Sequence, residues 1–187
     1  MTDQTAVVRP LRPGEGTYVQ QVFDGLSPHA RFLRFHVSMP RLSARWRAAL
    51  ATVEVGHRYG TLALVDGRAV GLAQWVRDPH HPARADVSVA VVDAHQRRGL
   101  ARLLMADLAG QAARHGIEEF SAWVHPENRL VLRLLAGLGA RPGPAGHEER
   151  LVPVHRFAAV PGIPGDPRGD VVVPFPRGVR RPRTALR

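Results

Sequence analysis

The sequence contains neither cysteine nor lysine, and each absence removes a class of chemistry. With 0 cysteines in the chain, disulfides, thiolate metal sites and a cysteine nucleophile are excluded. All 26 basic residues are arginines, so a Walker-type phosphate loop, which requires a lysine, is excluded as well. The strings H-E-x-x-H and G-x-S-x-G do not occur, and the 10 histidines show no metal-ligand spacing. No metal site is therefore implied.

Long hydrophobic runs are also missing. No uncharged apolar stretch approaches the roughly 18 residues that a membrane-spanning helix needs. The opening residues, MTDQTAVVRP, lack the basic start and apolar stretch of a signal peptide. We therefore expect a soluble, cytoplasmic protein without a membrane partner. With 187 residues, 44% of them hydrophobic, the chain can bury one proper core.

Aromatic residues make up only 6% of the chain, whereas the net charge is strongly positive, at +10. Arginine binds phosphate through bidentate hydrogen bonds, so this charge suits either coenzyme A or a nucleic acid. The excess is spread along the chain, with a balance of +6 in residues 1–157 (20 arginines, 14 acids) and +4 in residues 158–187 (6 arginines, 2 acids). Nucleic-acid platforms interleave stacking rings with positive charge, so a dedicated nucleic-acid function is disfavoured.

The composition changes near the C-terminal end. From Pro161 onward the chain contains 6 prolines among glycines and arginines, and such a segment buries too little apolar surface to order itself. We therefore predict a globular domain over residues 1–157 and a Pro/Gly/Arg-rich tail over residues 158–187. Val171 to Val173 could add an edge strand, but a loosely packed extension is the preferred interpretation.

Apolar periodicity predicts the elements of the globular domain. The predicted strands are Val7 to Leu11, Gly60 to Val65, Ala69 to Val76, Arg84 to Val92, Ile117 to Val124 and Leu151 to Phe157, with a hairpin turn at Asp66 and Gly67. The predicted helices are Val19 to Leu26, a short one from Pro28 capped by Ser27, one after Ser43, one from Leu100 to His115, and one between Asn128 and Gly139. The fold class that follows is α/β (α+β), with a mixed, mostly antiparallel sheet and helices on both faces.

A glycine-bearing turn before the longest helix is the most informative feature. Gln96, Arg97, Arg98, Gly99, Leu100 and Ala101 directly follow the apolar run Val87 to Val92. The first amides of a helix have no intrahelical acceptor, so this turn can cradle a phosphate. Taken alone, the string fits an arginine-rich turn with a helix-starting glycine equally well.

The wider pattern is more specific. The order strand, Q-R-R-G-L-A, helix, strand, E-N-R-x-x-L-R-L-L-x-x-L-G resembles the acyl-CoA-binding half of the GNAT family of N-acyltransferases. The segments Leu26 to Pro28, Arg31 to Phe35 and Pro40 to Ser43 are similar to bacterial GNAT domains related to protein lysine acetyltransferases. The resemblance extends over roughly residues 5–157 and implies acetyl-CoA as cosubstrate.

The resemblance also implies which residues bind acetyl-CoA. The turn would hold the pyrophosphate, the end of the preceding strand would orient the thioester carbonyl, and Asn128 would lie beside the thioester end. The residues so implied are Arg97, Arg98, Gly99, Leu100, Ala101 and Arg102 for the pyrophosphate, and Ala90, Val91 and Val92 for the carbonyl.

Acyl transfer to an amine needs a base, because an ammonium of pKa about 10.4 leaves only about one molecule in a thousand neutral at pH 7. In the GNAT family an acidic residue at the start of the strand before the phosphate turn often fills that role, and Asp86 occupies the matching place. Strand alternation puts Asp86 and Ser88 on one face. We therefore predict Asp86 as the base. A merely structural pairing of Asp86 with Arg84 or another arginine stays open. His80 and His81 are the second candidates for the base.

The general acid is unassigned. Many GNAT enzymes place a tyrosine seven residues after the asparagine, and this position holds Leu135. A thiol pKa near ~8.5 lets water protonate the leaving group. The predicted function is an N-acetyltransferase acting on an amine, either a protein lysine or a small amine. The alternatives are a non-catalytic acyl-CoA sensor and a basic nucleic-acid-binding protein; the oligomeric state stays open.

Overall fold

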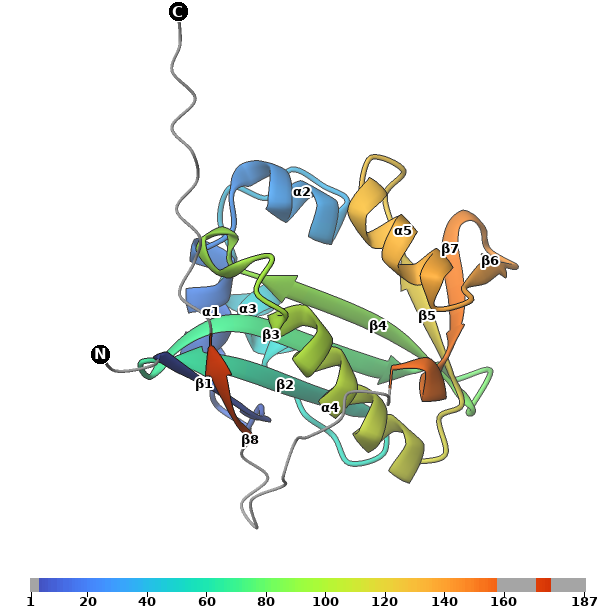
Figure 1. Ribbon diagram of the computed structural model, residues 1–187, viewed down its shortest axis with the longest axis horizontal. Helices are drawn as coiled ribbons and strands as arrows, with labels where there is room; N and C mark the ends of the chain where they lie inside the picture. The colour runs from blue at the N-terminus through green and yellow to red at the C-terminus, as the bar shows by residue number, and fades with distance from the viewer. Residues whose placement is uncertain (1–3, 158–170, 176–187) are drawn as a thin grey trace, which may run out of the picture.

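The computed structural model describes residues 4–157 and the backbone of residues 171–175 (Figure 1). In this part of the chain, eight strands form one sheet in the order β6-β7-β5-β4-β3-β2-β1-β8. The strands are β1 (Gln4–Pro10), β2 (Arg58–Val65), β3 (Arg68–Arg77), β4 (Arg84–Val91), β5 (Glu119–Trp123), β6 (Arg141–Gly143), β7 (Gly146–Pro153) and β8 (Val171–Phe175). Only β4 and β5 pair in parallel among the described strands. The expected mixed, mostly antiparallel sheet is confirmed.

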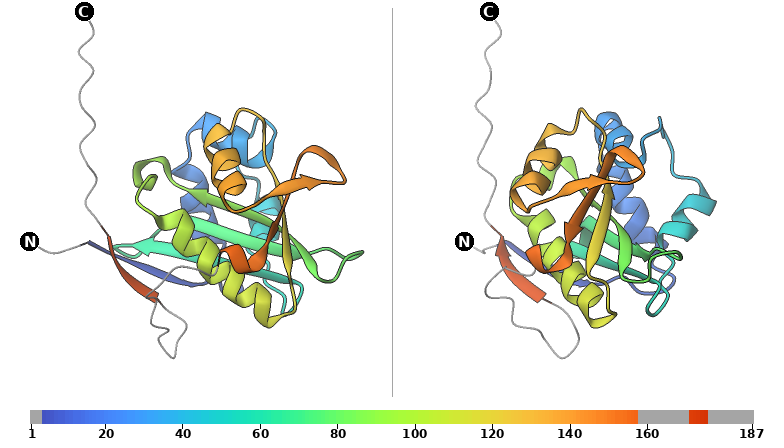
Figure 2. Two further views of the ribbon diagram at one scale, coloured as in Figure 1. Left: turned by 45° about the vertical axis from the view of Figure 1, so that its right-hand side comes forward. Right: turned by 90° about the vertical axis from the view of Figure 1, so that its right-hand side faces the viewer.

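Helices cover both faces of this sheet, as predicted. They are α1 (Gly16–Asp24), α2 (Pro28–Phe35), α3 (Ala44–Leu50), α4 (Leu100–Arg114) and α5 (Arg129–Gly137), with 3-10 turns η1 (Asp93–His95) and η2 (Val154–Arg156). Helices α4 and α5 lie on one side of the sheet, and α1 and α3 lie on the other (Figure 2). Among the residues that the structure describes, none of the helices combines the length and apolar character that crossing a bilayer demands.

The predicted start of α2 is confirmed in detail. The Oγ atom of Ser27 accepts a hydrogen bond of 3.2 Å from the amide of Ala30, and Pro28 occupies the first turn. Ser43 caps α3 in the same way, through the amide of Trp46. Each cap satisfies an amide that the helix itself cannot, so the two serines fix where these short helices begin.

Helix α4 supplies the largest buried contact with the sheet. Its residues Leu104 and Leu108 are fully buried, and Leu104 packs directly on Gly71 of β3. Gly71 is the ladder partner of Val91, so the odd-numbered residues of β4 face α4. The even-numbered residues, including Asp86 and Ser88, therefore face the opposite side, as strand alternation predicts.

Because α4 carries the glycine turn, its packing positions that turn. We expect Leu104→Ala to lower the free energy of unfolding by about 3 to 5 kcal/mol, since it removes a fully buried side chain and leaves a cavity. Urea denaturation measures this change. Leu130→Ala is the matched control, because Leu130 is 66% exposed on α5 and its truncation leaves no cavity. Equal losses for the two variants would contradict the assignment of Leu104 to the core.

Two segments differ from the sequence prediction. The last predicted strand, Leu151 to Phe157, is wrong in its bounds: β7 begins at Gly146 and ends at Pro153, and η2 follows. The polar start of β7 is held by ladder bonds to β5 and β6, which apolar periodicity does not reveal. The preferred interpretation of Val171 to Val173 as part of a loosely packed extension is wrong, because residues 171–175 form the edge strand β8, which pairs with β1. The remaining predicted tail lies outside the described residues, and the domain division stays a prediction.

Candidate active site

Strands β4 and β5 are paired only at their beginnings. The register joins Arg84, Ala85 and Asp86 to the first three residues of β5, and the last pair is Asp86 with Ser121. Strand β4 nevertheless continues to Val91, and the two ribbons diverge beyond the last pair (Figure 1). We call residues 87–91 the unpaired edge of β4. A strand edge of this kind presents backbone donors and acceptors to whatever lies beside it.

The ladder with β3 determines which amides face the unpaired edge. The amide of Val92 donates to the carbonyl of Val70 at 2.9 Å. In an antiparallel ladder, residues two apart point their backbone groups the same way, so the amide of Ala90 also faces β3. Of the three residues predicted to orient the thioester, only Val91 faces the edge. Val89, which the sequence analysis did not select, shares this direction with Val91.

The glycine turn leaves the start of α4 open. Gly99 is the N-cap with φ +84°, no described side chain caps the helix, and a Cβ at Gly99 would meet no atom within 4 Å. Within the described residues, nothing accepts a hydrogen bond from the amides of Gly99, Leu100 or Ala101. Unsatisfied amides at the positive end of the helix dipole attract anions.

Two neighbouring residues define the turn further. The Nε2 atom of Gln96 donates to the carbonyl of Val91 at 3.0 Å, which ties the turn to the end of β4. The amide of Arg102 donates to the carbonyl of Gly99 at 3.0 Å, so this amide is occupied and cannot serve the predicted cradle. Arg102 has an exposed side chain, as does Arg97. Their guanidinium groups, rather than the Arg102 amide, are accessible to a phosphate.

Asn128 and Leu135 both belong to α5. The Oδ1 atom of Asn128 accepts a hydrogen bond of 3.3 Å from the amide of Val131, which makes Asn128 the N-cap, as expected from the sequence. Leu135 is buried in the core. A hydroxyl group is thus lacking at the position where many related enzymes place a tyrosine, and the general acid stays unassigned.

Asp86 lies at the point where β4 and β5 begin to separate. Burial raises the pKa of its carboxyl group, and the negative charges of Asp78 and Glu149 add to this rise, against the influence of Ser121 and Arg84. The residue still has an exposed surface. A carboxylate with a raised pKa that remains accessible is a better general base than an ordinary aspartate.

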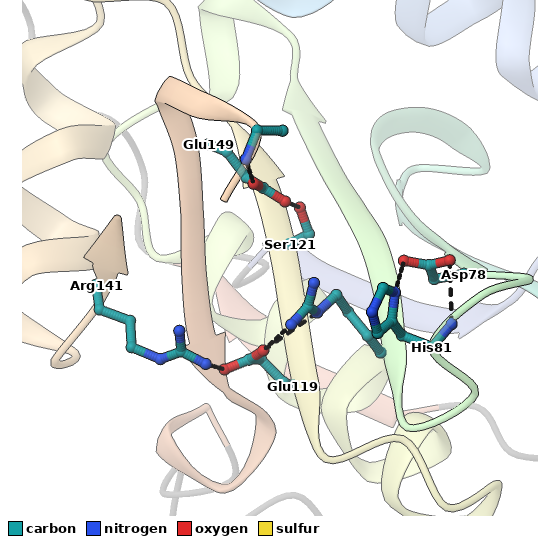
Figure 3. A network of polar contacts seen from close by, with 8 residues as sticks. Asp78, His81, Glu119, Ser121, Arg141 and Glu149 are labelled. Carbon is teal, nitrogen blue, oxygen red and sulfur yellow. Dashed lines mark hydrogen bonds and ion pairs between the residues drawn. The ribbon is translucent and has the colours of Figure 1, made fainter. Parts of the chain in front are cut away.

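Arg84 does not form an ion pair with Asp86. Its Nη2 atom lies 3.1 Å from Oε1 of Glu119, and Glu119 also pairs with Arg141 (Figure 3). Within the described residues no arginine forms an ion pair with Asp86, although the charge of Arg84 still lowers its pKa. The carboxylate of Asp86 is left for another role.

His80 and His81 lie in the loop between β3 and β4. Nδ1 of His81 is 3.2 Å from Oδ2 of Asp78, and the amide of His81 donates to Oδ1 of the same carboxylate (Figure 3). The amide of His80 donates to this Oδ1 atom as well. Both side chains are exposed, at the rim of an open hollow of about 480 Å³ that also includes Arg84 and Pro153. The histidines hold Asp78 as an anion, since the His80 amide lowers its pKa.

Several polar residues near Asp86 were missed by the sequence analysis. Glu149 of β7 is only 5% exposed, and its carboxylate accepts hydrogen bonds from Ser121 Oγ and from the amide of Ala145, both at 2.8 Å (Figure 3). Arg34 of α2 donates to Ser88 Oγ at 2.8 Å, and burial lowers its pKa to about 10. The one feature of the sequence that could have indicated these polar contacts is Ser121, a serine inside the apolar strand β5.

Helix α2 borders the site, with contacts to β4 and to the loop after β5. The rings of Phe32 and His125 are 4.9 Å apart, and Nδ1 of His36 lies 3.8 Å from Oε2 of Glu148. The two phenylalanines of α2 have different surroundings: Phe35 packs against Phe23 and the core, whereas Phe32 contacts the loop after β5. The site thus lies between α2, the start of β4 and the strands β5 and β7.

Comparison with known proteins agrees with this geometry. Residues 21–140 match the acetyltransferase (GNAT) family, and the chain belongs to that family. As a member of this family of acetyltransferases, the chain is an acyltransferase. The resemblance identified from the sequence is thereby confirmed.

Individual relatives carry names that fit the family. Acetyltransferase PA5475 from Pseudomonas aeruginosa is 26% identical over 156 residues, which are 81% of this chain and 83% of that protein. Acetyltransferase Pat from Mycolicibacterium smegmatis is 32% identical over 74 residues, 40% of this chain but only 22% of the relative. The chain therefore matches a minor part of the mycobacterial protein.

Solved structures share the fold. The GNAT domain of S. lividans PAT superposes with a TM-score of 0.71 at 26% identity, covering 79% of this chain and 89% of that one. The structure of yncA from Salmonella typhimurium with its cofactor acetyl-CoA gives a TM-score of 0.59 at 19% identity, covering 79% of this chain and 91% of that one. At this lower identity the likeness concerns the fold alone.

Proposed function

We propose that this chain transfers the acetyl group of acetyl-CoA directly to an amine, with Asp86 as the base, and that a protein lysine is the first candidate acceptor. The observation that carries the proposal is the placement of a raised-pKa carboxylate, Asp86, where β4 leaves β5, on the strand that leads to the open start of α4. Asp78 and Glu149 place negative charge near Asp86, which suits a cationic amine.

The turn before α4 would anchor the cosubstrate. The amides from Arg97 to Ala101, Arg98 among them, would surround the pyrophosphate, and the exposed guanidinium groups of Arg97 and Arg102 would add charge. The pantetheine arm would then follow the unpaired edge of β4, where the amides of Val89 and Val91 would bind it as an added strand does. Asn128 would lie on the opposite side.

The chemistry needs one proton transfer before attack. Asp86 takes a proton from the acceptor ammonium, and the neutral nitrogen attacks the thioester carbonyl carbon. The nitrogen of the tetrahedral intermediate releases its second proton to water, and the intermediate collapses with cleavage of the carbon–sulfur bond, which yields the amide and the thiolate of coenzyme A. Water protonates this thiolate, whose pKa is near ~8.5, so the leucine at position 135 does not prevent release.

The absence of cysteine and lysine makes a direct assay clean. The chain is incubated with acetyl-CoA and a panel of amines and lysine-containing proteins, and free thiol is followed with a chromogenic reagent. Since the chain has 0 cysteines, each new thiol is coenzyme A, and any acetyl-lysine found by mass spectrometry belongs to the substrate. We expect thiol release that depends on the amine and equals the N-acetyl product. Binding of acetyl-CoA without amine-dependent release would favour the sensor alternative.

A further inference from the structure

Glu149 is a buried carboxylate that has no cationic partner. It is 5% exposed, and no arginine or histidine of the described chain lies within ion-pair distance of it. Its oxygens are instead satisfied by Ser121 Oγ and the amide of Ala145. Burying a charge without a counter-charge is costly, so such groups are uncommon away from functional sites.

The turn between β6 and β7 is shaped around this carboxylate. A Cβ atom at Gly143 would lie 2.1 Å from Oε2 of Glu149, so only glycine leaves room for the side chain. Ala145 donates its amide from the same turn. Glu149 is consequently held in one place, with Oε1 directed at Ser121 (Figure 3).

Ser121 stands between Glu149 and Asp86. It is the register partner of Asp86 in the parallel pair, and its hydroxyl donates to Glu149 Oε1 at 2.8 Å. A serine hydroxyl has one proton and two lone pairs. Because the proton is engaged by Glu149, Ser121 offers a lone pair, and not a proton, to its neighbour Asp86.

We propose that Glu149, acting through Ser121, is a positioning residue that keeps Asp86 a strong base. The inference rests on the proposed role of Asp86. When Asp86 takes the proton from the acceptor ammonium, its new O–H group donates to Ser121 Oγ, while the serine proton stays on its hydrogen bond to Glu149. Because Glu149 engages the serine proton, that proton is withheld from Asp86, whose pKa it would otherwise lower, and the negative charge of Glu149 raises this pKa further.

Other charges surround Asp86 and stay unchanged when Glu149 is altered. Asp78 faces it from the β3–β4 loop and Arg84 from its own strand. Further off, Glu119 of β5 pairs with both Arg84 and Arg141 of β6, and Arg34 of α2 is bonded to Ser88. A pKa change in a Glu149 variant therefore reports the loss of Glu149.

The test substitutes Glu149 by glutamine and measures Asp86 directly. Glutamine can donate to Ser121 Oγ, which frees the serine proton to bond to Asp86 as a carboxylate. We expect Glu149→Gln to lower the pKa of Asp86 by on the order of one pH unit, read from the pH titration of its ¹³C carboxyl resonance. The acid limb of the pH profile of kcat/KM should shift by the same amount. Turnover should fall by up to about tenfold, and the Kd for acetyl-CoA should stay unchanged.

Glu148→Gln is the matched control, because this adjacent carboxylate contacts His36 rather than Ser121. Equal titration curves for Asp86 in the Glu149 and Glu148 variants would overturn the inference while leaving the proposed function intact. A fully active Asp86→Asn enzyme would instead overturn the proposed function. Should Glu149→Gln fail to fold, Ser121→Ala provides the second variant: Glu149 already withholds the serine proton from Asp86, so removing the hydroxyl should leave the Asp86 pKa nearly unchanged. A clear rise of the Asp86 pKa there would refute the inference, because it would show that Ser121 donates to Asp86 in the unmodified protein.

Discussion

Replacing Gly99 by glutamate is expected to weaken acetyl-CoA binding by at least about 100-fold, which corresponds to roughly 3 kcal/mol. The position at which a Cβ would be added is open, so the new side chain extends into the space that the pyrophosphate would occupy. Its carboxylate would itself take the free amides of α4 and repel the phosphates. Titration calorimetry with acetyl-CoA measures the effect.

The control for this variant is Gly116→Glu, just beyond the other end of α4. Gly116 also has a positive φ, +72°, and open space around its Cβ position, so the backbone strain is matched. We expect Gly116→Glu to bind acetyl-CoA like the unmodified protein. Both variants should unfold cooperatively, since neither introduces a steric clash. Normal affinity in a folded Gly99→Glu protein would mean that the pyrophosphate binds elsewhere.

Asp86→Asn is expected to lower turnover by about 100- to 10,000-fold, the usual contribution of a general base. The amide cannot accept a proton at neutral pH, so the acid limb of the pH–rate profile should disappear as well. The Kd for acetyl-CoA should stay unchanged, because Asp86 lies at the start of β4 and the turn follows its end. Steady-state kinetics over a range of pH and calorimetry separate the two effects.

The same substitution has a predictable sign for stability. Burial raises the pKa of Asp86, so its charged form is less favourable in the folded protein than in the unfolded chain. Above the unfolded pKa this residue therefore reduces stability, and Asp86→Asn should leave the Tm at pH 7 equal or higher. Asp24→Asn, at the exposed end of α1, is the control and should alter neither rate nor pH profile. A slow Asp86 variant with a clearly lower Tm would point to misfolding rather than to a lost base.

The elements of the site that depend on local sequence were predictable. The run Val87 to Val92, the glycine turn and the periodic helix behind it appear in one continuous segment, and the structure has β4, Gly99 as N-cap and α4 in these places. Asn128 as a helix cap follows from similarly local rules. Such features depend on backbone conformation and on residues within a few positions of each other.

The parts that depend on strand pairing were not predictable in the same way. The contact between Ser121 and Glu149 joins residues 28 positions apart, and Glu149 lies in a polar stretch that apolar alternation does not identify as a strand. The hydrogen-bonding direction of β4 is a related case. Alternation gives the side-chain face, but the partner of Val92 on β3 decides that Val89 and Val91, rather than Ala90, face the unpaired edge.

The short pairing of β4 with β5 has a mechanical consequence for the catalytic cycle. Only three register pairs join the part of the sheet formed by β1 to β4 and β8 to the part formed by β5, β7 and β6. A molecule that forms hydrogen bonds along the unpaired edge of β4 and also contacts α5 connects these two parts of the sheet. Free coenzyme A retains the same pyrophosphate and pantetheine as the acetylated form. Its contacts with both parts of the sheet therefore persist after the chemical step. Release of the product must break these contacts, and we therefore expect product release to limit turnover.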